Sequence, residues 1–181
     1  MGPWPCWQLR MVDVPASELI SIGCEVADMR KAGFTCEALT QAGVSSAELK
    51  AGGFKLKVLK QFFSVQTLLF EADYSVANMK MSGVGALELS EAGCSGSDLR
   101  LAGFNAEALK SIGLGVAELR EAGFPINHLE NAGYDARDLR EGGFSPAEMI
   151  PLCFSAEELH QAVSIQDPQP NATHVALSRE V

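Results

Sequence analysis

Positive charge is scarce in this chain: 14 Lys and Arg stand against 23 Asp and Glu, giving a net charge of −9 over 181 residues. A nucleic-acid-binding protein needs a basic face to neutralise phosphates, so this balance argues against nucleic acid as a partner. It argues equally against a polybasic membrane anchor. Uninterrupted apolar runs long enough to span a bilayer, roughly 18 residues, are also lacking. The N-terminal stretch lacks the apolar segment of a secretory signal.

Cysteine is sparse and scattered. The five cysteines form no CxxC pair: Cys6, Cys24, Cys36, Cys94 and Cys153. A disulfide scaffold or a zinc site is therefore not expected. We expect small buried thiols in the cytoplasm or another reducing compartment.

Signatures of catalysis are missing as well. The three histidines, His128, His160 and His174, share no metal-ligand spacing. Gly83-Val84-Gly85 and Gly113-Leu114-Gly115 resemble fragments of a nucleotide-binding loop but do not complete one. No nucleophile elbow is present. We therefore predict no catalytic residues, no metal and no cofactor.

The chain is instead dominated by a ten-residue repeat. A Leu or Met recurs at every tenth position without insertion or deletion: Leu19, Met29, Leu39, Leu49, Leu59, Leu69, Met79, Leu89, Leu99, Leu109, Leu119, Leu129, Leu139, Met149 and Leu159. Four residues after most of these positions stands a glycine, followed by an aromatic or aliphatic residue.

Each decamer is typical of one short helix and a turn. In Ser-Pro-Ala-Glu at 145–148, Ser145 is a candidate N-cap, Pro146 suits the first helical position and Glu148 completes a capping box. The same box is predicted for Ser45 with Glu48 and for Ser155 with Glu158, and single caps at Thr35, Ser75, Ser95, Asn105 and Asp135. The glycine then suits the left-handed position that ends a helix.

The residue after the glycine and the charges follow the same period. Phe124 is placed to pack backward on Leu119 and forward on Leu129, joining two successive helices. Acidic residues favour the first turn and basic residues the last turn, which is the arrangement that a helix dipole prefers.

The decamers with the triplets AGF, AGY and GGF resemble decapeptide-repeat proteins, a resemblance that implies no known activity. Stretches such as A-D-Y-S-V (72–76), A-N-M-K-M (77–81) and S-D-L-R-L (97–101) also resemble pentapeptide-repeat proteins, which would imply a right-handed β-helix. A β-helix would, however, turn large polar residues such as Glu37, Lys57 and Arg137 inward. We predict an all-α solenoid of about fifteen two-turn helices, with the β-helix as the alternative.

The predicted organisation has three parts. Residues 1–14 form an N-terminal cap segment that includes Trp4 and Trp7, residues 15–162 form the solenoid, and residues 163–181 form a flexible tail. Residues 55–74 depart from the repeat. Phe63 and Asp73 replace glycines there, and Lys55 and Val65 replace caps, so two repeats are expected to fuse into one longer helix.

The same irregular stretch holds the candidate site. Positions that are polar in other repeats become apolar, and lysines flank them, which is typical of a partner or self-association surface. The candidate interface comprises Val58, Phe62, Phe63, Leu68, Phe70, Lys55, Lys57 and Lys60. The alternative is that these residues pack internally where the solenoid changes course.

The predicted function is a non-catalytic repeat scaffold that binds a protein partner or a second copy, a function that includes the role of a structural subunit in a larger assembly. The alternative is an enzyme or small-ligand-binding protein that uses a concave face near the irregular repeats.

Overall fold

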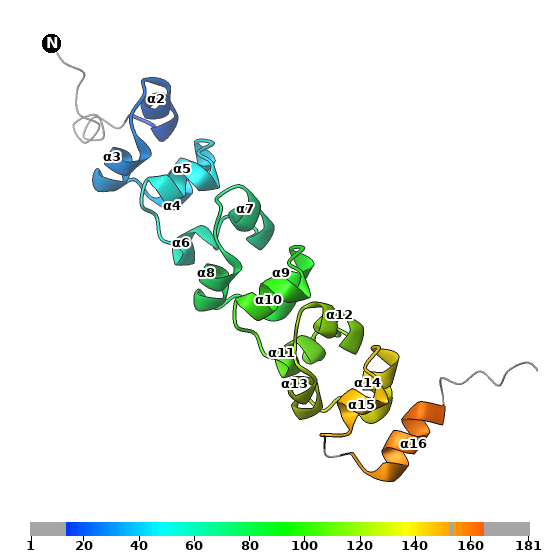
Figure 1. Ribbon diagram of the computed structural model, residues 1–181. Coiled ribbons are helices and arrows are strands. Elements are labelled where there is room, and N and C mark those ends of the chain that lie inside the picture. Colours follow the sequence, from blue (N-terminus) through cyan, green and yellow to red (C-terminus); the bar gives the residue numbers. More distant parts are fainter. Residues whose placement is uncertain (1–13, 153, 165–181) are drawn as a thin grey trace, which may run out of the picture. The chain divides into compact units, whose positions relative to one another are not determined.

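The computed structural model describes residues 14–152 and 154–164 (Figure 1). These residues divide into two compact units between Ser95 and Gly96. Every regular element in the described residues is an α-helix, so the helical prediction is confirmed over the β-helix. The first unit contains α2 (Ala16–Ser21), α3 (Val26–Lys31), α4 (Cys36–Gln41), α5 (Ser46–Ala51), α6 (Leu56–Leu59), α7 (Val65–Phe70), α8 (Val76–Met81) and α9 (Ala86–Glu91). The second contains α10 (Gly96–Leu101), α11 (Ala106–Ser111), α12 (Val116–Glu121), α13 (Ile126–Asn131), α14 (Ala136–Glu141), α15 (Pro146–Met149) and α16 (Ala156–Ser164).

Glycine ends the regular helices in the predicted way. Gly123, after α12, has φ of 83°, a left-handed conformation that costs glycine little. Its amide donates to the carbonyl of Arg120 at 2.9 Å, and the amide of Phe124 donates to that of Leu119 at 3.0 Å. These two bonds make a Schellman motif, which satisfies carbonyls that the helix end leaves open.

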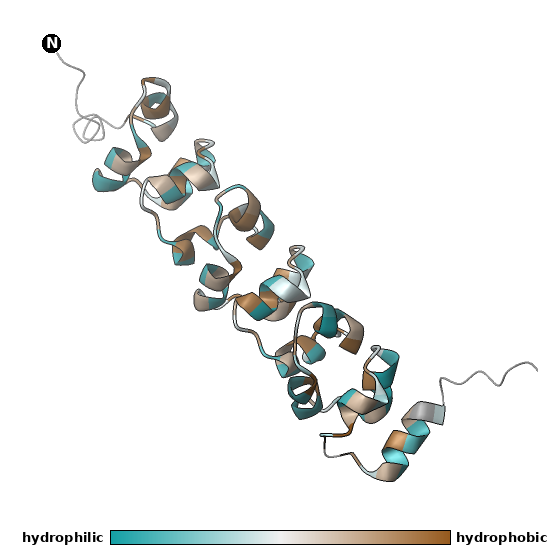
Figure 2. Ribbon diagram, viewed as in Figure 1, coloured by the Kyte–Doolittle hydropathy of each residue, from teal (hydrophilic) through white to brown (hydrophobic). Residues whose placement is uncertain are grey.

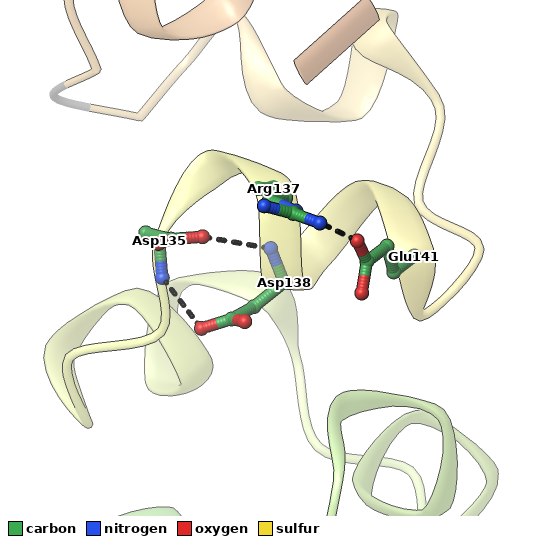
Figure 3. Close-up of polar contacts among 4 residues, drawn as sticks. All are labelled: Asp135, Arg137, Asp138 and Glu141. Atoms are coloured by element: carbon green, nitrogen blue, oxygen red, sulfur yellow. Dashed lines mark hydrogen bonds and ion pairs between the residues drawn. The ribbon is translucent and has the colours of Figure 1, made fainter. Parts of the chain in front are cut away.

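Side-chain caps begin many of the helices. The boxes predicted at Ser45, Ser145 and Ser155 are confirmed, each with both bonds to the glutamate three residues on. Thr35, Ser75, Asn105 and Asp135 also accept a backbone N–H as predicted. Figure 3 shows the box at the start of α14, where Asp138 fills the glutamate's role, and the exposed ion pair between Arg137 and Glu141.

Within each unit, helices pack on the helix two places along the chain. The contacts join α2 with α4, α3 with α5, α5 with α7 and α7 with α9 in the first unit, and α10 with α12, α11 with α13, α12 with α14 and α14 with α16 in the second. Each unit is therefore an all-α solenoid. The Leu or Met of nearly every decamer from Leu19 to Met149 is fully buried, so these side chains form the core of the repeats.

Two glycines mark the closest approaches between these helices. A Cβ at Gly52, at the end of α5, would lie 2.5 Å from Cγ1 of Val26 in α3. A Cβ at Gly142, at the end of α14, would likewise overlap Val116 of α12. Alanine occupies the equivalent position in most other repeats, so glycine here offsets the extra volume of the facing valine.

The irregular stretch differs from the prediction in two ways. α6 and α7 stay separate helices, because Ser64 caps α7 by accepting the amide of Thr67. This cap lies one position early, so Leu68 is fully buried in place of Leu69. The period is regained after α7, where Asp73 adopts φ of 51° in the place of the missing glycine.

Other predictions fall at the ends of the chain. The cap segment with Trp4 and Trp7, and the tail beyond residue 164, lie outside the described residues. Helix α16 reaches Ser164, two residues past the predicted end of the solenoid. The expectation of reduced thiols is wrong for Cys24, which is disulfide-bonded. Cys36 and Cys94 form no disulfide.

Candidate functional site

The basic side chains of the last helical turns reach across to another repeat. Nζ of Lys50, in α5, donates to the carbonyls of Ala72 and Asp73 at the end of α7, both at 2.7 Å. Five other cations make the same kind of bond to a carbonyl 22 or 23 residues further on: Arg30 to Gly52, Lys60 to Ser82, Arg100 to Ala122, Lys110 to Gly133 and Arg120 to Gly143. We call these six contacts the inter-repeat clamps.

Aromatic rings complete three of the clamps. Lys50 lies over the ring of Tyr74 at 4.4 Å from its centroid, and Lys110 over Tyr134 at 4.3 Å. Arg120 lies over the ring of Phe144 at 4.9 Å. In each pair the aromatic residue stands 24 positions after the cation, directly after the left-handed residue that ends the clamped helix.

The clamps give the periodic cations a different role from the predicted one. Their charge does face helix C-terminal carbonyls, as dipole complementarity requires. The helix concerned is the one two repeats on, so each cation bonds neighbours of the stacked row together. Because the clamps bond these cations within the solenoid, their side chains are not free to bind a partner.

Two lysines of α6 stand apart from this pattern. Lys55, the N-cap residue of α6, and Lys57 are exposed, and neither side chain makes a hydrogen bond, ion pair or ring contact with another described residue. Every other Lys and Arg in the described part of the chain has a partner. Besides the clamps, Lys31 pairs with Asp28, Arg137 pairs with Glu141, Arg140 bonds the carbonyl of Phe144, and Lys80 is also engaged.

Exposed apolar side chains accompany these lysines. Val58 is 37% exposed and Phe62 is 38% exposed. No Asp or Glu occurs between Glu48 and Glu71, although the chain as a whole is acidic. We call Lys55, Lys57, Val58 and Phe62 the α6 surface. In Figure 2 the neighbouring α7 is brown over most of its length, in keeping with its Val, Leu and Phe content.

The α6 surface continues toward α8. Nζ of Lys60 donates to the carbonyl of Ser82 at 2.9 Å, which joins the C-terminal ends of α6 and α8. Met81, the residue before Ser82, is 86% exposed. Helix α8 carries no acidic residue, so it adds no negative charge beside the free lysines.

The structure separates the eight residues of the predicted interface. Four of them form the α6 surface, and Phe70 is 68% exposed at the end of α7. Leu68 is fully buried in the core, so it offers no surface to a partner. Phe63 is half-buried, and Lys60 is half-buried and clamped to Ser82. Sequence reasoning missed the clamps themselves, although the recurrent spacing of 24 between cation and aromatic was a signal for them.

The described residues hold no cluster of groups suited to metal binding. In the described residues no three His, Cys, Asp or Glu side chains come together in a way that could hold a metal ion. No helix of the described chain is long and apolar enough to cross a membrane. Burial raises the pKa of the Cys36 thiol, against a smaller opposite effect from its hydrogen bond with Thr40.

Comparison with known proteins identifies the repeat. The family model described as the decapeptide repeat region matches residues 5–69 and 103–167, well over half of the chain. Neither the curated proteins nor the solved structures contain a significant match. The period, the glycine stops and this match agree, and the chain belongs to the decapeptide-repeat family.

Proposed function

We propose that this protein is a non-catalytic binding module whose solenoid presents the α6 surface to a protein partner. The observation that carries the proposal is the pair of unpaired lysines, Lys55 and Lys57, beside Val58 and Phe62. Elsewhere in the described chain the cations are bonded internally, so free positive charge and exposed apolar area coincide at this place.

The energetics of the repeat favour such a role. A cation that bonds a carbonyl gains a charge-assisted hydrogen bond worth about 1.5–3 kcal/mol net. Lys55 and Lys57 gain no such bond, and Val58 and Phe62 leave apolar area in water. These side chains contribute little to the stability of the solenoid, and a bound partner would use all four.

Site-specific photo-crosslinking in the native cells tests the proposal. A benzophenone amino acid replaces Phe62 in one version of the full chain and Leu101, 74% exposed in α10, in the control version. We expect discrete crosslinked products from position 62 that position 101 does not give, and their loss when Val58 is also changed to Ser. The same products from both positions, or none from position 62, would refute the proposed site.

A further inference from the structure

We infer that the partner of the α6 surface is an acidic protein segment in which at least two carboxylates flank an aromatic or aliphatic side chain. The inference rests on the proposed function and adds the chemistry of the partner. It follows from the charges that face outward on α6 and on the elements packed against it.

The positive charge at this surface is not neutralised from within. Neither Lys55 nor Lys57 forms an ion pair with a carboxylate in the described part of the chain. Helix α5, which packs against α6, contributes Glu48, which already accepts hydrogen bonds from the hydroxyl and the amide of Ser45. α8, joined to α6 through Lys60, contributes none. A carboxylate that forms an ion pair with these lysines must therefore come from outside the α6 surface.

Other anionic partners fit the surface less well. Two free lysines are too few for a nucleic acid, whose binding rests on neutralising several phosphates. They are also fewer than the four to eight basic residues, roughly, that hold a protein on an anionic bilayer. Phe62 and Val58 add an apolar area that a free small anion would not use. An acidic peptide with an apolar residue uses both parts of the surface.

A second copy of this chain is the competing occupant. The chain carries a net charge of −9, so copies repel one another at long range. This repulsion favours a different protein, which can bring its carboxylates on a short segment.

Peptide selection on the purified full chain tests the inference. A displayed library of random peptides of about twelve residues is selected on the wild-type protein, and the most enriched peptide is synthesised for fluorescence anisotropy. We expect enrichment of Asp and Glu beside aromatic or aliphatic residues. Binding should weaken roughly 3- to 30-fold in the double variant Lys55→Gln, Lys57→Gln, as two exposed ion pairs would give, and should weaken with added salt.

A matched control lowers the net charge of the chain by the same two units at a different place. Ser111→Glu with Asn131→Glu changes two exposed residues of α11 and α13 and also makes the chain more negative by two charges. We expect less than about a twofold effect from this control on peptide binding. Circular dichroism of both double variants checks that they keep the helical fold.

The outcomes separate the two claims. The enriched peptides could carry no excess of Asp and Glu, and Phe62→Ser could weaken their binding while the lysine variant does not. That result would support the docking surface and refute the acidic partner. If neither the lysine variant nor Phe62→Ser weakens any selected peptide, the proposed function fails as well. If ultracentrifugation shows a dimer that the lysine variant dissociates, the occupant is a second copy and the inference is overturned.

Discussion

Removing one inter-repeat clamp should destabilise the protein far more than removing a free lysine of the same length. Lys50→Met abolishes two hydrogen bonds of 2.7 Å, to the carbonyls of Ala72 and Asp73, and the ring contact with Tyr74. One charge-assisted hydrogen bond is worth about 1.5–3 kcal/mol and an exposed cation–π contact about 0.5–1 kcal/mol. At the lower end of each range the two bonds and the ring contact together would give about 3.5 kcal/mol. Lys50 is only half-buried, so solvent screening reduces this sum, and we expect a loss of about 2 kcal/mol in the free energy of unfolding.

Urea denaturation followed by far-UV circular dichroism measures this loss. The control is Lys57→Met in the adjacent α6, which removes the same charge from a lysine without an internal partner and should change stability by less than about 0.5 kcal/mol. A double-mutant cycle of Lys50→Met with Tyr74→Leu should give a coupling of about 0.5–1 kcal/mol. Equal effects of Lys50→Met and Lys57→Met would refute the clamp as a stabilising contact.

Three further predictions concern the local rules of the repeat. Gly52→Ala should lower the free energy of unfolding by about 1–3 kcal/mol, because the added methyl group overpacks against Val26. Val26→Ala should restore most of this loss in the double variant, and purely additive effects of the two changes would contradict the close approach. Ser46→Ala should raise the free energy of unfolding by about 1 kcal/mol, since the Ser46 hydroxyl is buried without a partner; a destabilised variant in the same urea titration would show that the hydroxyl is bonded. Hydrogen bonds from the Ser45 hydroxyl and amide lower the pKa of Glu48 below its ordinary value of 4.5, so this capping box stabilises the fold above that pH and its contribution is lost as the pH falls through the lowered value. Ser45→Ala should therefore show a shallower loss of stability on acidification below about pH 5, and an unchanged pH profile would exclude the box as its source.

The local features of the fold were predictable because their causes lie within one decamer. Ser45 and Glu48 are three residues apart, and the stop at Gly123 needs only a residue that tolerates a positive φ. The same local reasoning went wrong where the period slips. Ser64 caps α7 one position early, so Leu68 rather than Leu69 enters the core. A strict ten-residue period places the cap at Val65, so it did not predict Ser64 as the cap.

The candidate site was only partly predictable because it depends on contacts between repeats. Lys57 and Lys60 look alike in the sequence, yet Lys60 bonds Ser82 of another repeat and Lys57 bonds no residue that the structure describes. Separating these two lysines requires knowing that helices within a unit pack on the helix two places along. The spacing of 24 residues between Lys110 and Tyr134 reflects that packing and could serve to find clamps in related repeats.

The central claim is that the cations of residues 14–152 and 154–164 are bonded within the chain except at α6. Limited acetylation of the folded protein, with each lysine followed by mass spectrometry, tests this claim directly. We predict that Lys55 and Lys57 react fastest and that the clamped Lys50, Lys60 and Lys110 react at least roughly tenfold more slowly, the factor that about 1.4 kcal/mol of clamp energy gives. In urea all five should react at similar rates. Fast acetylation of the clamped lysines in the folded protein, at the rate of Lys55 and Lys57, would contradict the account.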